Sequence, residues 1–180
     1  MWRAGFYRLQ QFWQGWLAAV DPAELSAALV YLPPAAQVHF QRLPTDAQRH
    51  SLNVLKTLQQ RTDVNGELAA AALLHDIGKL AADEAGLRIT LWVRGLLVVF
   101  EKVAPQWLAR MASADMQHGW RYLLYVHQIH PVLGAQWAQT WGCTSLTCWL
   151  IEHHQDELAA EPSTEADQLL LLLQWADSQN

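Results

Sequence analysis

The segment ALLHDIGKL, residues 72–80, places a histidine and an aspartate side by side in an otherwise apolar run. Burying His75 and Asp76 costs free energy unless each side chain finds a partner. A divalent metal would be such a partner, because iron, manganese and zinc accept imidazole nitrogen and carboxylate oxygen as ligands. The pair therefore predicts a metal site whose other ligands lie elsewhere in the chain.

Further polar side chains lie on or beside predicted apolar helix faces. They are His50, His130, His153, His154 and Asp177. A single buried histidine is more often a hydrogen-bonded core residue than a ligand. A set of such groups spread over several helices instead indicates a shared site. His127, one turn before His130, is a substitute ligand, and His39 and His118 are interpreted as surface or packing residues.

The hydrophobic pattern predicts helices along almost the whole chain. Apolar residues recur at three- and four-residue steps, and no segment alternates convincingly with period two. The expected helices cover residues 2–17, 22–31, 35–43, 46–61, 67–80, 89–103, 105–112, 120–128, 131–141, 144–158 and 165–178. Asp21 and Thr45 are expected to cap the helices that follow them. His130 is expected at the N-cap of a helix that Pro131 opens. The predicted class is all-α.

Composition favours one domain in a reducing compartment. The 180-residue chain is 52% apolar, which suits a substantial core. Its net charge of −5 argues against long nucleic acid as a partner, because such binding rests on neutralising phosphates. Cys143 and Cys148 fit neither a disulfide framework nor a CxxC zinc site. The N-terminus lacks the apolar run of a signal peptide, and residues 122–151 are interrupted by polar side chains, so we expect a cytoplasmic protein without a transmembrane span.

Three motifs, in this order, resemble the HD superfamily of metal-dependent phosphohydrolases. They are QRHSLNVLKTL with His50, AALLHDIGKL with His75 and Asp76, and LLQWAD with Asp177. The resemblance implies an all-helical HD domain over residues 46–180, with residues 1–45 as an N-terminal helical extension packed on it. The long interval before His130 is interpreted as an inserted helical pair within residues 81–118.

Two more motifs resemble the branch that contains the HD-GYP phosphodiesterases and the YqeK-like dinucleoside polyphosphate hydrolases. They are HPVLGA with His130 and LIEHHQDE with His153 and His154. The resemblance to HD-GYP members implies that these additional histidines hold a second metal. The DGxGYP signature does not follow the paired histidines, which argues against hydrolysis of cyclic di-GMP.

The spacing of His75 and Asp76 is consistent with two metals. Adjacent residues of a helix point about 100° apart, so His75 can bind one ion while the two oxygens of Asp76 bridge both. One ion would take His50, His75, Asp76 and Asp177. The other would take Asp76, His130, His153 and His154. We expect divalent transition metals, with iron or manganese favoured and zinc, magnesium or nickel as alternatives.

The expected activity is hydrolysis of a small phosphomonoester or a nucleotide-type phosphodiester by a metal-activated hydroxide. Asp76 would bridge the metals, and Lys79 would meet the substrate phosphate as a point charge. Lys79 could almost equally be a solvated lysine at a helix end. Two alternatives stay open: a mononuclear nucleotidase that uses only His50, His75, Asp76 and Asp177, and an HD-fold module that binds metal or nucleotide without turnover. A homodimer is compatible with the sequence.

Overall fold

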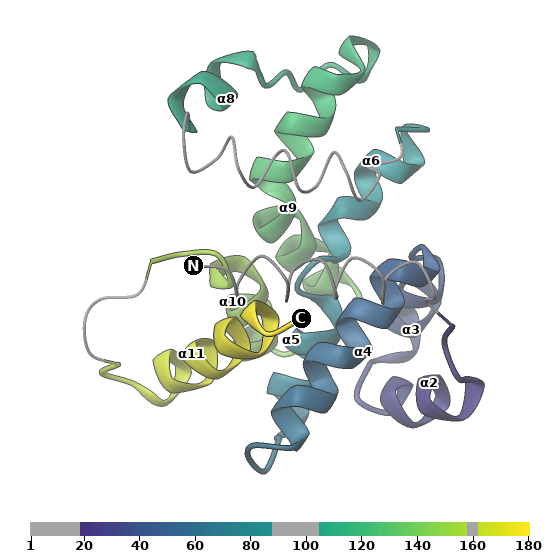
Figure 1. The fold of residues 1–180 in the computed structure, drawn as a ribbon, viewed down its shortest axis with the longest axis vertical. Helices are drawn as coiled ribbons and strands as arrows, with labels where there is room; N and C mark the ends of the chain where they lie inside the picture. Colours follow the sequence, from purple (N-terminus) through teal and green to yellow (C-terminus); the bar gives the residue numbers. More distant parts are fainter. Residues whose placement is uncertain (1–18, 88–104, 158–161) are drawn as a thin grey trace, which may run out of the picture. The chain divides into compact units, whose positions relative to one another are not determined.

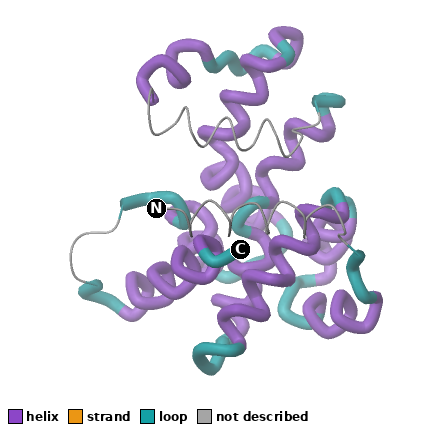
Figure 2. The backbone as a smooth tube through the Cα atoms, viewed as in Figure 1, coloured by secondary structure: helices purple, strands orange, loops and turns teal. Residues whose placement is uncertain are grey.

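The computed structural model describes residues 19–87, 105–157 and 162–180. All regular secondary structure in these ranges is helical, which confirms the all-α class (Figures 1 and 2). The elements are α2 (Pro22–Leu29), α3 (Pro34–Gln41), α4 (Thr45–Gln59), α5 (Gly66–Leu74), η1 (Ile77–Lys79), α6 (Leu80–Glu84), α8 (Pro105–Met111), η2 (Met116–His118), α9 (Trp120–Thr140), α10 (Ser145–His153) and α11 (Glu165–Ser178). The helices predicted over residues 2–17 and 89–103 lie outside the described residues.

The chain divides into two compact units. Residues 1–77 and 131–180 form the first unit, and residues 78–130 form the second. These units do not test the predicted division into residues 1–45, residues 46–180 and an insertion over 81–118, which stays a prediction. Within the ranges that the structure describes, no helix combines the length and the apolar character needed to cross a bilayer.

Helix α5 forms the centre of the first unit. Helices α4, α10 and α11 all pack against it, and α11 also packs against α4 and α10 (Figure 1). Every residue from Leu68 to Leu74 is buried. A helix that is apolar on all sides belongs in a core, and its four consecutive alanines let the neighbouring helices approach closely. This packing brings the ends of several helices together around the end of α5.

The second unit has a small core of its own. Leu108 of α8 and Leu124 of α9 are buried against each other, with Met111 packed beside them. The Arg121 side chain donates from Nε to the Met111 carbonyl at 2.8 Å. These contacts join α8 to the first part of α9 within this unit.

Helix starts follow the predicted caps in part. Asp21 caps α2, because its carboxylate accepts a hydrogen bond from the Ala23 amide. The prediction that Thr45 caps α4 was wrong. Thr45 is the first residue of that helix, and Pro44 occupies the N-cap without a side-chain hydrogen bond. Pro44 has extended backbone angles (φ −53°, ψ 147°), so the helix can begin directly after it.

A salt bridge links α2 to α4 in the first unit. Arg49 donates from Nη1 and Nη2 to the two carboxylate oxygens of Glu24, at 3.0 and 2.7 Å. The hydrogen bond from Arg49 lowers the pKa of Glu24 more than partial burial raises it. The ionised form is therefore favoured by folding. The stability that it contributes is present above the ordinary carboxyl pKa and is lost as pH falls through the lowered one.

We expect Glu24→Gln to lower the free energy of unfolding by about 0.5–1 kcal/mol at neutral pH, the size of a partly exposed ion pair. The difference between variant and parent should shrink as the pH falls through the lowered pKa of Glu24, because the parent carboxyl then becomes protonated as well. Urea denaturation at neutral and at acid pH measures the effect. Glu152→Gln, at an exposed position on α10, is the matched control. A difference that persists unchanged in acid would contradict the assignment.

Candidate metal centre

The His75–Asp76 pair lies where α5 ends. The predicted helix over residues 67–80 stops at Leu74, and its continuation tightens into the short 3-10 helix η1. Gly78, which has a low helix propensity, lies in that continuation. His75 is only 1% exposed, while the Asp76 side chain is 16% exposed. The pair is thus held at the end of a buried helix, where side chains from neighbouring elements can reach it.

Three side chains from three elements of the first unit meet at this end of α5. His50 Nε2, on α4, lies 3.2 Å from His75 Nε2 and 3.0 Å from Asp177 Oδ1, on α11. His75 Nε2 lies 3.6 Å from the same Asp177 oxygen. Ligands at about 2.0–2.2 Å from one metal ion are separated by roughly these distances. The group formed by His50, His75 and Asp177 could therefore hold a metal ion.

The Asp177 carboxylate is in the charge state that a ligand requires. Burial raises its pKa, but the interactions with the facing side chains of His75 and His50 outweigh burial. The net result is a pKa below the usual range for aspartate. Asp177 is therefore ionised at neutral pH, as a metal-binding carboxylate must be.

The three most buried histidines share one hydrogen-bonding pattern. In each, Nδ1 lies close to the carbonyl oxygen three residues earlier: His75 to Ala72 at 3.0 Å, His130 to His127 at 2.6 Å, and His154 to Ile151 at 2.7 Å. A carbonyl only accepts hydrogen bonds, so Nδ1 must carry the hydrogen. In the neutral ring, Nε2 then keeps its lone pair, which is the form that binds a metal.

Local backbone structure makes these carbonyls available. Ala72 and Ile151 lie in the last turns of α5 and α10, where carbonyls have no partner within the helix. The carbonyl of His127 loses its helical donor for another reason, because Pro131, four residues later, has no N–H. In each case the histidine ring donates a hydrogen bond to a carbonyl that has no backbone donor within the helix.

The expected helix break at Pro131 was wrong. The helices predicted over residues 120–128 and 131–141 are one helix, α9, with Pro131 inside it, and His130 is not an N-cap. The hydrogen bond from the His130 ring to the His127 carbonyl replaces the one that Pro131 cannot make. His130 is fully buried and is the last residue of the second unit. His127 supplies the carbonyl and stacks on the His130 ring, with 5.9 Å between the centroids.

Asp76 lies between two histidines of the first unit. Its Oδ2 atom is 3.8 Å from His75 Nε2, and its Oδ1 atom is 3.8 Å from His154 Nε2. The rings of His75 and His154 are 5.2 Å apart, edge to face. The two oxygens of one carboxylate therefore face different imidazole nitrogens. This arrangement extends the donor set of the first unit to His154.

The paired histidines of LIEHHQDE point in different directions. His154 is buried beside Asp76, whereas the His153 side chain is one-third exposed and its Nδ1 lies 2.6 Å from Asp156 Oδ2. The His153 ring also packs on Trp149, at 4.7 Å between centroids. Adjacent residues at a helix end project about 100° apart, and here only the His154 ring turns toward Asp76. The structure therefore separates His153 from the other predicted ligands.

The other polar residues singled out in the sequence are placed as follows. Lys79 ends η1 in the second unit and is half-buried. His39 stacks on Trp141, at 4.2 Å between centroids, which is a packing role. The exposed His118 ring contacts the Ser113 hydroxyl at 2.8 Å. These two histidines are thus surface and packing residues, as predicted.

Sequence reasoning missed Gln174. Its amide nitrogen donates to the carbonyl of Asp156 at 2.8 Å and contacts that of His153 at 3.5 Å, which ties the end of α10 to α11. Gln174 lies one turn before Asp177 on the same helix. That spacing was the signal that could have identified it, because residues three apart on a helix share a face.

Comparison with known protein families agrees with this geometry. Residues 48–178 match the family model of the HD domain. The chain belongs to the HD domain family. The match includes His50, the His75–Asp76 pair and Asp177, and it confirms the predicted superfamily. No curated protein and no solved structure matches the chain significantly. The resemblance to the HD-GYP and YqeK-like branch therefore stays a prediction.

Proposed function

We propose that this HD domain protein is a metal-dependent phosphohydrolase that cleaves a small phosphomonoester or a nucleotide-type phosphodiester. Most HD domain proteins are metal-dependent hydrolases, although some have no catalytic activity. The observation that carries the proposal is the group formed by His50, His75 and Asp177. It combines two imidazole nitrogens with an ionised carboxylate, at separations that suit one divalent ion.

We assign the predicted ligands to two sets. His50, His75 and Asp177 would hold the first ion. Asp76 would contribute to both sets, because its two oxygens face His75 and His154. Of the two adjacent histidines predicted for a second ion, we keep His154 as a proposed ligand and not His153. His130 remains a proposed ligand of that ion because it is fully buried and its Nδ1 hydrogen is fixed by the His127 carbonyl.

Divalent metals at these residues would supply Lewis acidity and lower the pKa of water. The protein's own contribution is to keep the imidazoles oriented and the site partly dry. The carbonyls of Ala72 and Ile151 hold the rings of His75 and His154 in one tautomer. Lys79 stays a proposed contact for the substrate phosphate, as a positive charge on a flexible stem.

Metal analysis combined with a phosphate-release screen tests the proposal. We expect about two transition-metal ions per chain, as this mixed histidine and carboxylate set favours. The metal-loaded protein should release phosphate from mononucleotides or aryl phosphates faster than it cleaves cyclic di-GMP or single-stranded DNA. Cleavage of these two is followed by chromatography of the products, because hydrolysis of a diester releases no inorganic phosphate. Preferred turnover of the last two would refute the substrate class. Metal-loaded protein that turns over none of these esters would favour the alternative, a non-catalytic HD-fold binding module.

Metal removal should also destabilise the first unit. A ligand that binds only the folded state stabilises it by about 3–4 kcal/mol at 100 to 1,000 times its dissociation constant. We therefore expect a chelator to lower the melting temperature by several degrees and added manganese to restore it. His50→Ala should abolish this response, whereas His39→Ala, outside the group, should keep it. An equal manganese response in both variants would count against the first ligand set.

A further inference from the structure

A groove of about 600 Å³ adjoins the candidate metal centre within the first unit. Two of the proposed ligands, His154 and Asp177, are among the residues that line it. The rest of its wall comes from the segment after α10 and from one side of α11. The groove is therefore a continuation of the metal site and a natural place for the organic part of a substrate.

The groove carries negative charge. Beyond the proposed metal ligand Asp177, the acidic residues Asp156 and Glu157 line it, and no lysine or arginine is among the described residues of its wall. The Asp156 carboxylate contacts His153, whereas the Glu157 side chain is exposed. An anionic group placed here would meet like charge.

Hydrogen-bond acceptors outnumber donors in the groove, where Gln155 adds an amide and Ser178 a hydroxyl to the three carboxylates and Gln174. The amide nitrogen of Gln174 is engaged by the carbonyls of His153 and Asp156, which leaves the amide oxygen of Gln174 as an acceptor. Ionised carboxylates accept hydrogen bonds and do not donate them. A complementary ligand would present donors, such as amino, ammonium or hydroxyl groups.

The net positive charge of the proposed metal centre would balance about one phosphate group. Two divalent ions would carry a charge of about +4, and the carboxylates of Asp76 and Asp177 would offset about half of it. The remainder matches one phosphate dianion. A second phosphate or a carboxylate on the substrate would have to lie in the acidic groove.

We infer that the substrate is a monophosphate ester whose organic part is uncharged or cationic and rich in hydrogen-bond donors, and that Glu157 helps to select it. This inference rests on the proposed function, because it assigns the substrate phosphate to the metal centre. Polyphosphates and esters with an acidic organic part are disfavoured. The selection is electrostatic, so it weakens as ionic strength rises.

Three matched esters test the inference on the manganese-loaded full chain: 4-aminobutyl phosphate, butyl phosphate and 3-carboxypropyl phosphate. Calorimetry measures the binding of each ester, and phosphate release measures its turnover. We expect the ammonium ester to bind about three- to tenfold more tightly than the carboxylate ester at low salt, the scale of one or two partly screened charge contacts. The uncharged ester should fall between them.

Charge reversal at one groove position provides the decisive comparison. Glu157→Lys should remove or invert the order of affinities, whereas Glu152→Lys should preserve it. Glu152 is exposed on α10 and does not line the groove. Glu152→Lys therefore changes the net charge by the same amount as Glu157→Lys without changing the charge of the groove. Equal binding of the three esters, or the same order of affinities in Glu157→Lys, would overturn the inference even if all esters are hydrolysed. The expected order of affinities without any phosphate release would support the inference and overturn the proposed hydrolase function.

Discussion

Asp76→Ala is expected to remove bound metal and phosphohydrolase activity together. The two oxygens of Asp76 face His75 and His154, so one substitution withdraws a carboxylate from both proposed ligand sets. Loss of an outer-shell partner alone typically costs 10- to 100-fold, so loss of a shared ligand should lower kcat/KM by about 1,000-fold or more. Metal content by mass spectrometry and phosphate release from an aryl phosphate measure the two effects on one sample.

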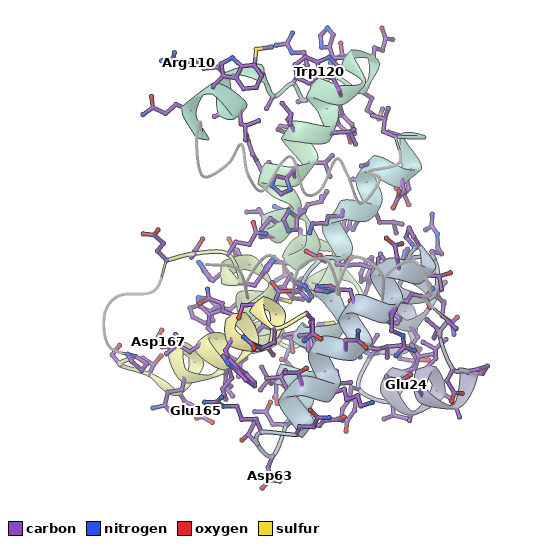
Figure 3. The ribbon with its side chains drawn as sticks, in the orientation of Figure 1. Glu24, Asp63, Arg110, Trp120, Glu165 and Asp167 are labelled. Atoms are coloured by element: carbon purple, nitrogen blue, oxygen red, sulfur yellow. The ribbon has the colours of Figure 1, made fainter. Side chains whose placement is uncertain are left out.

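The matched control is Asp63→Ala. Asp63 is an exposed aspartate in the loop between α4 and α5 (Figure 3), and its loss should leave both measurements unchanged. His127→Ala should likewise be mild, because His127 offers its backbone carbonyl, which alanine retains. Full metal content in Asp76→Ala would show that the bridging role was misassigned. Metal loss with activity retained would show that hydrolysis does not depend on the metal.

The second large loss of activity is expected from substitution of one histidine of the His153–His154 pair. His154→Ala should lower kcat/KM by about 100-fold or more and reduce metal content, because a buried imidazole with a fixed tautomer is lost beside Asp76. His153→Ala removes a ring that lies at the surface and contacts Asp156. We expect it to change kcat/KM by about threefold at most, as for a surface contact.

Neighbouring alanine substitutions are a strict comparison, because they share sequence context and helix position. Circular dichroism and melting temperature should show that both variants remain folded. If His153→Ala proves to be the damaging change, the ring orientations that separate the pair are wrong for the functional state. If both variants keep activity and one metal, the mononuclear alternative gains support, since it needs only His50, His75, Asp76 and Asp177.

Much of the fold could be predicted from local sequence pattern. The alanine- and leucine-rich run of α5 is apolar on all sides, so it had to be a buried helix whichever elements covered it. Asp21 before Pro22 predicted the start of α2, because a cap acts on the amides that follow it directly. The His75–Asp76 pair was equally visible, since its two members are adjacent and their burial follows from the surrounding residues.

The tertiary structure decided which side chains meet. His50 and Asp177 are distant in the chain, and only the packing of α4 and α11 on α5 brings their side chains to 3.0 Å. The sequence predicted a helix break at Pro131, but the ring of His130 satisfies the freed carbonyl and the helix continues. Such compensation depends on a side-chain orientation that residue types do not specify.

The sequence by itself determined the helical class, the HD motif and the candidate donor residues, because these depend on periodicity and on neighbouring residues. It placed His153 on the apolar stripe with His154 beside it and could not decide which ring faces the site, since the two differ by one step of about 100° around the helix axis. The direction of that step relative to the core is set by how α10 packs on α5 and α11. The acidic groove has the same origin, because its walls come from two segments whose proximity is fixed by packing and by the Gln174 hydrogen bonds.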